Sequence, residues 1–96
     1  MQIERFEDII AWQQAKVLTV NIYSLFSESR DFVFRDQIQR ATVSVMNNIA
    51  KVLTKKHNEF KHFMFIAKGS CSEVCSMLYL AKELNKITDN DFKTFF

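Results

Sequence analysis

The sequence predicts an all-α fold, an antiparallel up-and-down four-helix bundle with a short or truncated fourth helix. Two observations predict it. The 96 residues include one Gly and no Pro, whereas a β-rich fold needs these residues at many turns. Apolar residues also recur at alternating steps of three and four along three long segments, which is the spacing of one helix face. A chain of this length forms one core, so we expect a single domain over residues 1–96.

The first helix is expected from about Asp8 to Glu28. Asp8 is the expected N-cap, because its carboxylate would lie near the positive end of the helix. The polar residues 27–31 would form the first loop. The apolar stripe of this helix comprises Ala11, Ala15, Leu18, Ile22 and Leu25.

The second helix is expected to start near Phe32 and to continue to about Lys56. Asn48 occupies a position of its apolar stripe, so a polar group points toward a packed surface. Buried polar groups need hydrogen-bond partners, and Ser44 lies one turn before Asn48. The apolar members of the stripe are Phe34, Ile38, Ala41, Val45 and Val52.

The third helix is expected from an N-cap at Asn58 to about Lys86, and it carries two adjacent apolar stripes. A helix with so little polar surface is either central in the core or contacts another subunit as well. Gly69 and Ser70 suit the close approach of another helix. The first stripe is Phe60, Met64, Ala67, Cys71, Val74, Leu78 and Ala81, and the second is Phe63, Ile66, Met77, Leu80, Leu84 and Ile87.

A short fourth helix is expected after Thr88, which would be its cap, with Asp91 in the capping-box position. Phe92, Phe95 and Phe96 would form its apolar face. A helix of barely two turns is unstable alone, so it must dock or fray.

Several strings, in this order, resemble motifs of the bacterial four-helix-bundle proteins encoded by intervening sequences in 23S ribosomal RNA genes. The strings are Phe6-Glu7-Asp8-Ile9 with Trp12-Gln13-Gln14-Ala15, Asp36-Gln37-Ile38-Gln39-Arg40-Ala41, Val43-Ser44-Val45 with Asn47-Asn48-Ile49-Ala50, and Glu59-Phe60 through Ile66-Ala67 followed by Gly69-Ser70 and Glu73. The chain departs from the family at Lys51-Val52, where the family usually has Glu-Gly, and at Met46, where it usually has Pro. The family's fourth helix normally extends further.

The resemblance implies a bundle that assembles into a homo-oligomeric ring, with a pentamer as the expected form. The family includes accessory proteins of diversity-generating retroelements, which bind RNA and a reverse transcriptase. The resemblance therefore also implies a bacterial protein for which nucleic acid is a candidate partner.

Residues 51–68 contain five lysines, two histidines and one acid, Glu59. Clustered cations on a rigid element are typical of phosphate contacts, so these lysines are the candidate nucleic-acid-binding residues. The alternative is that these lysines form a solvent-exposed end of the bundle and contribute to solubility alone. The candidate residues are Lys51, Lys55, Lys56, Lys61 and Lys68.

Arg40 and Glu73 lie on adjacent expected helices, each among apolar neighbours. We expect them to form an interhelical ion pair that fixes the register of the helices, with Asn48 and Ser70 nearby. The alternative is that one of them faces a channel shared by the subunits of an oligomer.

No motif of a catalytic or metal site is recognised. Cys71 and Cys75 alone do not complete a tetrahedral metal site, and His57 and His62 are about 140° apart around a helix. We expect no metal and no cofactor. An enzyme that uses Glu73 or His57 would need a pocket that gathers them.

The function expected is that of a non-enzymatic homo-oligomer that binds RNA or DNA through a basic surface. The formal net charge of +2 does not itself identify a partner. The alternative is a protein-binding adaptor or scaffold that uses apolar helix surfaces and binds no nucleic acid. No secretion leader and no membrane span are recognised, so we expect a cytoplasmic protein.

Overall fold

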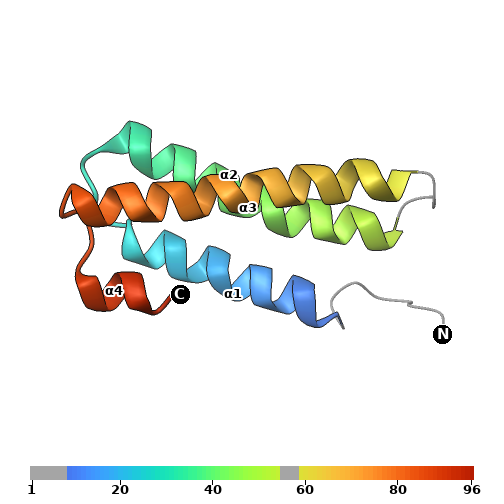
Figure 1. Ribbon diagram of the computed structural model, residues 1–96, viewed down its shortest axis with the longest axis horizontal. Helices are drawn as coiled ribbons and strands as arrows, with labels where there is room; N and C mark the ends of the chain where they lie inside the picture. Colours follow the sequence, from blue (N-terminus) through green and yellow to red (C-terminus); the bar gives the residue numbers. More distant parts are fainter. Residues whose placement is uncertain (1–8, 55–58) are drawn as a thin grey trace.

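A computed structural model describes residues 9–54 and 59–96 of the chain, and every regular element in these ranges is a helix. The elements are α1 (Ile10–Leu25), α2 (Phe32–Thr54), α3 (Phe60–Glu83) and α4 (Asp89–Lys93). The three long helices lie lengthwise in a molecule of 45 × 21 × 20 Å, and α2 packs against both α1 and α3 (Figure 1). The prediction of an all-helical chain is confirmed.

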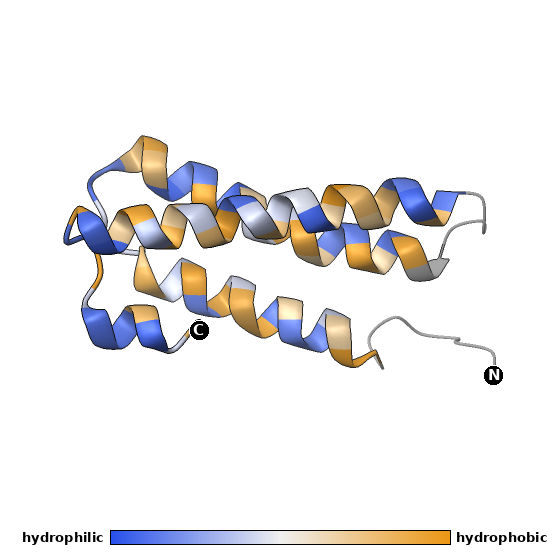
Figure 2. Cartoon of the chain, in the orientation of Figure 1, coloured by the Kyte–Doolittle hydropathy of each residue, from blue (hydrophilic) through white to orange (hydrophobic). Residues whose placement is uncertain are grey.

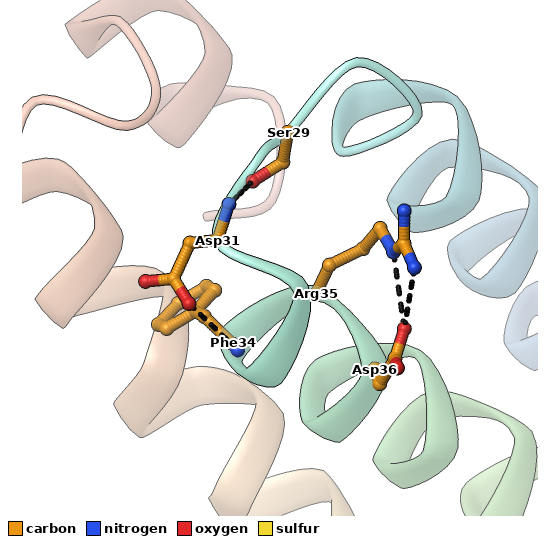
Figure 3. Close-up of polar contacts among 5 residues, drawn as sticks. All are labelled: Ser29, Asp31, Phe34, Arg35 and Asp36. Carbon is orange, nitrogen blue, oxygen red and sulfur yellow. Dashed lines mark hydrogen bonds and ion pairs between the residues drawn. The ribbon is translucent and has the colours of Figure 1, made fainter.

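The corner between α1 and α2 is fixed by Asp31, which the sequence placed in a polar loop. The backbone N–H of Phe34 donates to Asp31 Oδ1 at 3.1 Å, and the N–H of Asp31 donates to Ser29 Oγ at 3.3 Å (Figure 3). Lys86 Nζ lies 2.9 Å from Asp31 Oδ2. The hydrogen bond from Lys86, followed by that from the Phe34 N–H, lowers the pKa of Asp31 below its ordinary value. Asp31 therefore caps α2 and links it to the segment after α3.

The end of α3 is set by Asn85, whose φ of 57° is left-handed. The N–H of Lys86 donates to Ala81 O at 2.8 Å, and the N–H of Asn85 donates to Lys82 O at 3.1 Å. These two bonds form a Schellman motif, in which Asn is tolerated because its short polar side chain suits the left-handed region. The motif ends α3 at Glu83, before the expected Lys86.

The capping box predicted for α4 is present. Thr88 Oγ1 accepts from the N–H of Asp91 at 3.0 Å, and Asp91 Oδ2 accepts from the N–H of Thr88 at 3.3 Å. The rings of Phe92 and Phe96 lie with their centroids 4.9 and 5.2 Å from that of Tyr79 on α3. The short helix thus docks against α3 through its aromatic side chains.

The core is concentrated at the end of the molecule where α1 ends, α2 begins and α3 ends. The rings of Phe26 and Phe34 lie 5.6 Å apart at this end, and Leu18, Leu25, Phe92 and Phe95 pack against the buried cluster. The cluster itself comprises Ile22, Phe26, Phe34, Ile38, Ala41, Val74, Met77, Leu78, Ala81 and Ile87.

The buried face of α1 differs from the expected stripe. Thr19 and Phe26 are buried, whereas Ala11 is exposed and Leu18 is only half-buried. The Thr19 hydroxyl is satisfied within its own helix, because it donates to Ala15 O at 2.8 Å. A threonine can therefore take a core position that an apolar pattern assigns to leucine.

The expected first stripe of α3 is also wrong at several positions. Phe60, Met64 and Cys71 are exposed, although Ala67, Val74, Leu78 and Ala81 are buried as expected. Figure 2 shows hydrophobic residues along the whole length of α3, so apolar character does not distinguish its buried half from its exposed half. Packing within one chain covers only part of this helix.

Asn48 is buried and hydrogen-bonded, as its place in the stripe predicts. Asn48 Nδ2 donates to Ser44 O at 2.7 Å and to Ser44 Oγ at 3.2 Å. The hydroxyl of Ser70 on α3 donates to Ser44 Oγ at 2.9 Å. This chain of hydrogen bonds joins α2 to α3 beyond the end of the apolar core.

Candidate functional site

The described members of the candidate nucleic-acid-binding set lie in the half of the molecule away from the core. Lys51, Lys61 and Lys68 are exposed there, whereas Lys55 and Lys56 lie outside the described residues. Lys61 and Lys68 are two helical turns apart on α3 and therefore share a face. Phe65 lies between them on that face and is 79% exposed.

Lys51 approaches α3 from another side. Its Nζ lies 5.6 Å from the ring centroid of Phe63. Phe63 is about 200° from Lys61 around an α-helix, so Lys51 is not on the face formed by Lys61 and Lys68. The three described candidate lysines therefore lie on two sides of this half of the molecule and do not form a single flat patch.

A groove of about 610 Å³ lies between α2 and α3, and Arg40 and Glu73 both line it. Both side chains are exposed, not enclosed by apolar neighbours as expected. Neither forms an ion pair within the ranges that the structure describes, so their pairing stays a prediction. Asp36, by contrast, is held by Arg35, whose Nε and guanidinium Nη2 each lie 3.0 Å from Asp36 Oδ1 (Figure 3).

The groove wall includes residues that sequence reasoning did not select. Asp36 and Gln37 precede Arg40 by four and three residues, and Ser44 follows it by four. This is the spacing of one helix face, so the helical period counted from Arg40 would have found all three. Asp36 and Arg40 also border a second hollow of about 380 Å³ on the side of α1, with Tyr23 in its wall.

The two thiols lie one turn apart on α3. Cys71 is exposed and Cys75 is half-buried. Burial, followed by the neighbouring Cys71, raises the pKa of the Cys75 thiol. Within residues 9–54 and 59–96, no group of three or more His, Cys, Asp or Glu side chains could hold a metal ion. An enzyme that uses Glu73 or His57 would need a pocket that gathers them; His57 lies outside these ranges, and Glu73 lines the same groove as Arg40.

The fold and these surfaces define a small all-helical protein with exposed cations around one end and a polar groove between two of its helices. A family model described as 23S rRNA-intervening sequence protein matches residues 7–96. The chain belongs to this family, and the resemblance noted from its motifs is confirmed. No curated protein and no solved structure matches the chain. Within the described residues, no helix is both long and apolar enough to cross a membrane.

Proposed function

We propose that this chain is a non-enzymatic, homo-oligomeric RNA-binding member of the 23S rRNA-intervening sequence protein family. In this proposal the helices form one cytoplasmic domain, an antiparallel up-and-down four-helix bundle in which α4 is the short fourth member. The motifs shared with the family support a ring of five chains. Contacts to phosphates come from the basic end, and DNA is the second nucleic acid to test.

The observation that carries the proposal is the exposed face of Lys61, Phe65 and Lys68 on α3. Two cations on a rigid helix supply phosphate contacts without sequence selection. An aromatic ring exposed between them offers a surface on which an unpaired base can stack. No acidic residue lies between Lys61 and Lys68 in the sequence, so nothing within this segment offsets their charge.

The test is the affinity for a structured RNA with unpaired loops, measured by fluorescence anisotropy at several salt concentrations. The double variant Lys61→Glu/Lys68→Glu should weaken binding at least about 100-fold and flatten its dependence on salt. Phe65→Ala should weaken binding by about 5–150-fold with the salt dependence retained, because stacking contributes about 1–3 kcal/mol per base.

The matched control is Arg30→Glu/Lys93→Glu, which changes the net charge by the same amount at exposed positions near the opposite end. It should retain nearly full affinity. Equal losses in the two double variants would mean that overall charge, not the basic end, governs binding. Absence of RNA binding by the wild-type chain would refute the proposal.

The second candidate is a protein-binding adaptor, which the exposed apolar residues of α3 favour. Phe60 and Met64 are exposed near the basic end, and Leu80 and Leu84 are exposed toward the other end. Replacing the lysines by Glu would spare the binding of such a partner, whereas replacing Phe60 and Met64 by Ser would weaken it.

A further inference from the structure

Cys71 and Cys75 lie one helical turn apart on α3, and both are free thiols. A hydrogen bond joins their side chains, so the two sulfur atoms lie close together. Cys71 is exposed to solvent, whereas Cys75 is half-buried. Neither thiol belongs to the buried cluster or takes part in the proposed binding of RNA. The chain therefore presents a pair of adjacent sulfur ligands at its surface.

The pair lies on the side of α3 that carries α4. Tyr79 and Lys82 follow Cys75 by four and seven residues, so all three share this side of the helix. The ring of Phe92 lies with its centroid 4.9 Å from that of Tyr79 and 4.7 Å from Lys82 Nζ. The short α4 docks there (Figure 1), and one turn before Cys75 the thiol of Cys71 is exposed. A small solute in water can therefore reach both sulfurs.

The spacing of the pair does not suit a disulfide. Side chains four residues apart on a helix have Cβ atoms about 5–6 Å apart, whereas a disulfide needs about 3.5–4.5 Å. A direct bond would require the backbone to move around Val74, which is 2% exposed in the core. An atom placed between the sulfurs removes this conflict, because two bonds of about 2.3 Å at a tetrahedral angle hold the sulfurs about 3.8 Å apart.

An ion bound between the two sulfurs has few other ligands from the protein. In the described part of the chain, no third His, Cys, Asp or Glu joins Cys71 and Cys75 in a group that could hold a metal. Structural zinc takes four protein ligands, so this pair does not suit it. Thiolates select soft ions, and Cu(I) and As(III) are soft ions that are stable with two or three ligands.

We propose that Cys71 and Cys75 form a binding site for a soft ion of low coordination number, Cu(I) or As(III). Cu(I) binds between the two sulfurs as each thiol releases its proton to solvent. As(III) enters as arsenous acid, As(OH)3, in which the two sulfurs replace two hydroxyl groups. Each of these hydroxyl groups leaves as water with a thiol proton, and the third stays on arsenic. The site is independent of the proposed binding of RNA, because it uses none of the lysines.

The state of the half-buried thiol agrees with this chemistry. Burial, followed by the neighbouring Cys71, raises the pKa of the Cys75 thiol, so it carries a proton at neutral pH. Binding of either ion must therefore release that proton.

The experiment uses the reduced protein without oxygen and two probes. Cu(I) is supplied by the coloured competitor bicinchoninate, and As(III) is supplied as phenylarsine oxide, which loses its oxygen as water when two thiols bind. The wild type should bind one ion per chain, and X-ray absorption at the copper edge should show two sulfur neighbours. Cys71→Ser and Cys75→Ser should each weaken binding at least about 100-fold, because the second thiol binds in an intramolecular step.

The matched control exchanges two neighbouring residues, as Cys75→Ser/Ser76→Cys. This exchange variant keeps both cysteines and the composition of the chain, and Ser76 is exposed. It places the thiols five residues apart, which is about 140° around the helix. It should bind as weakly as the single variants. Cys71→Ser removes an exposed thiol, so its thermal midpoint without ion should equal that of the wild type and its loss of binding is not a loss of fold.

Several results would overturn the proposal. They are a wild-type chain that binds neither probe, an exchange variant that binds as tightly as the wild type, and Zn(II) that binds as tightly as Cu(I). An ion that raises the mass in light scattering would also overturn it, because the ion would then join thiols of different chains. Binding of one probe alone would support the site and identify which of the two ions it takes.

Discussion

Replacing Leu78 by Ala tests whether the core is where the structure places it. Leu78 is 1% exposed and belongs to the buried cluster of α1, α2 and α3. Truncation of such a side chain loses transfer free energy and leaves a cavity, which together reduce the free energy of unfolding by about 3 kcal/mol. Each kcal/mol shifts the thermal midpoint of a domain of this size by about 4–8 °C, so Leu78→Ala should lower it by about 12–24 °C.

The matched control is Leu80→Ala, the same substitution two residues further along the same helix. Leu80 is 48% exposed, so about half of the removed apolar surface is already in water and no cavity forms. Its expected cost is about 1 kcal/mol. Thermal unfolding followed by circular dichroism, at a concentration where the chain is dissociated, gives both values. Equal losses for the two variants would refute the assignment of the buried face of α3.

Two more predictions concern the ends of α3 and α2. Asn85→Ala should lower the free energy of unfolding by about 1–2 kcal/mol, measured by urea unfolding, because Ala is strained in the left-handed region. Asn85→Gly should keep or raise this free energy, because Gly adopts that region without strain. Equal effects of the two substitutions would exclude the Schellman motif as the cause. The pKa of Asp31 is lowered in the folded chain, so its contribution to stability is complete above the ordinary value of 3.8 and is lost as pH falls through the lower folded value. Asp31→Asn should therefore make the free energy of unfolding fall less steeply as the pH is lowered. Lys86→Met should raise the pKa of Asp31 in an NMR titration. An unchanged pKa would show that the ion pair with Lys86 is not populated.

The features that sequence could predict depend on local chemistry. The capping box of Thr88 and Asp91 is set by residues three apart, so its sequence pattern determines the start of α4. The burial of Asn48 followed from its place in the apolar stripe, and Ser44 and Ser70 provide the hydrogen-bonded neighbours that this burial requires. These expectations hold because few distant residues are needed to satisfy them.

The features that were missed depend on how the helices pack. Leu18 and Thr19 follow Ala15 by three and four residues, so the helical period allows either to lie on the buried face of α1. In the structure Thr19 is the one that is buried against α2. On α3, two adjacent apolar stripes compete, and periodicity does not say which positions remain uncovered. Asp31 caps α2 through its hydrogen bond with the start of that helix, and it also forms an ion pair with Lys86. The start of α2 and Lys86 are far apart in the sequence.

The sequence selects the candidate residues of the basic end, whereas their positions relative to one another depend on how the helices pack. The exposure of Lys61 and Lys68 agrees with a basic end, but the position of Lys51 on another side depends on the rotation of α2 against α3. The facing of Arg40 and Glu73 across one groove follows from their helices being neighbours. Whether they pair depends on the width of that groove, which no sequence pattern encodes.

The apolar core lies at one end of the molecule, and this affects the binding free energy of any ligand at the opposite, basic end. Phe63 and Ile66 are only half-buried there, whereas Val74, Leu78 and Ala81 are closed off from solvent. Local opening of the first turns of α3 should therefore cost less than global unfolding, and we expect their amides to exchange with solvent sooner than those of the second half. A ligand bound at this end would suppress that opening, and part of its binding free energy would be spent on ordering the helix. The affinity of the basic end for such a ligand would therefore be coupled to the stability of the least protected part of the molecule.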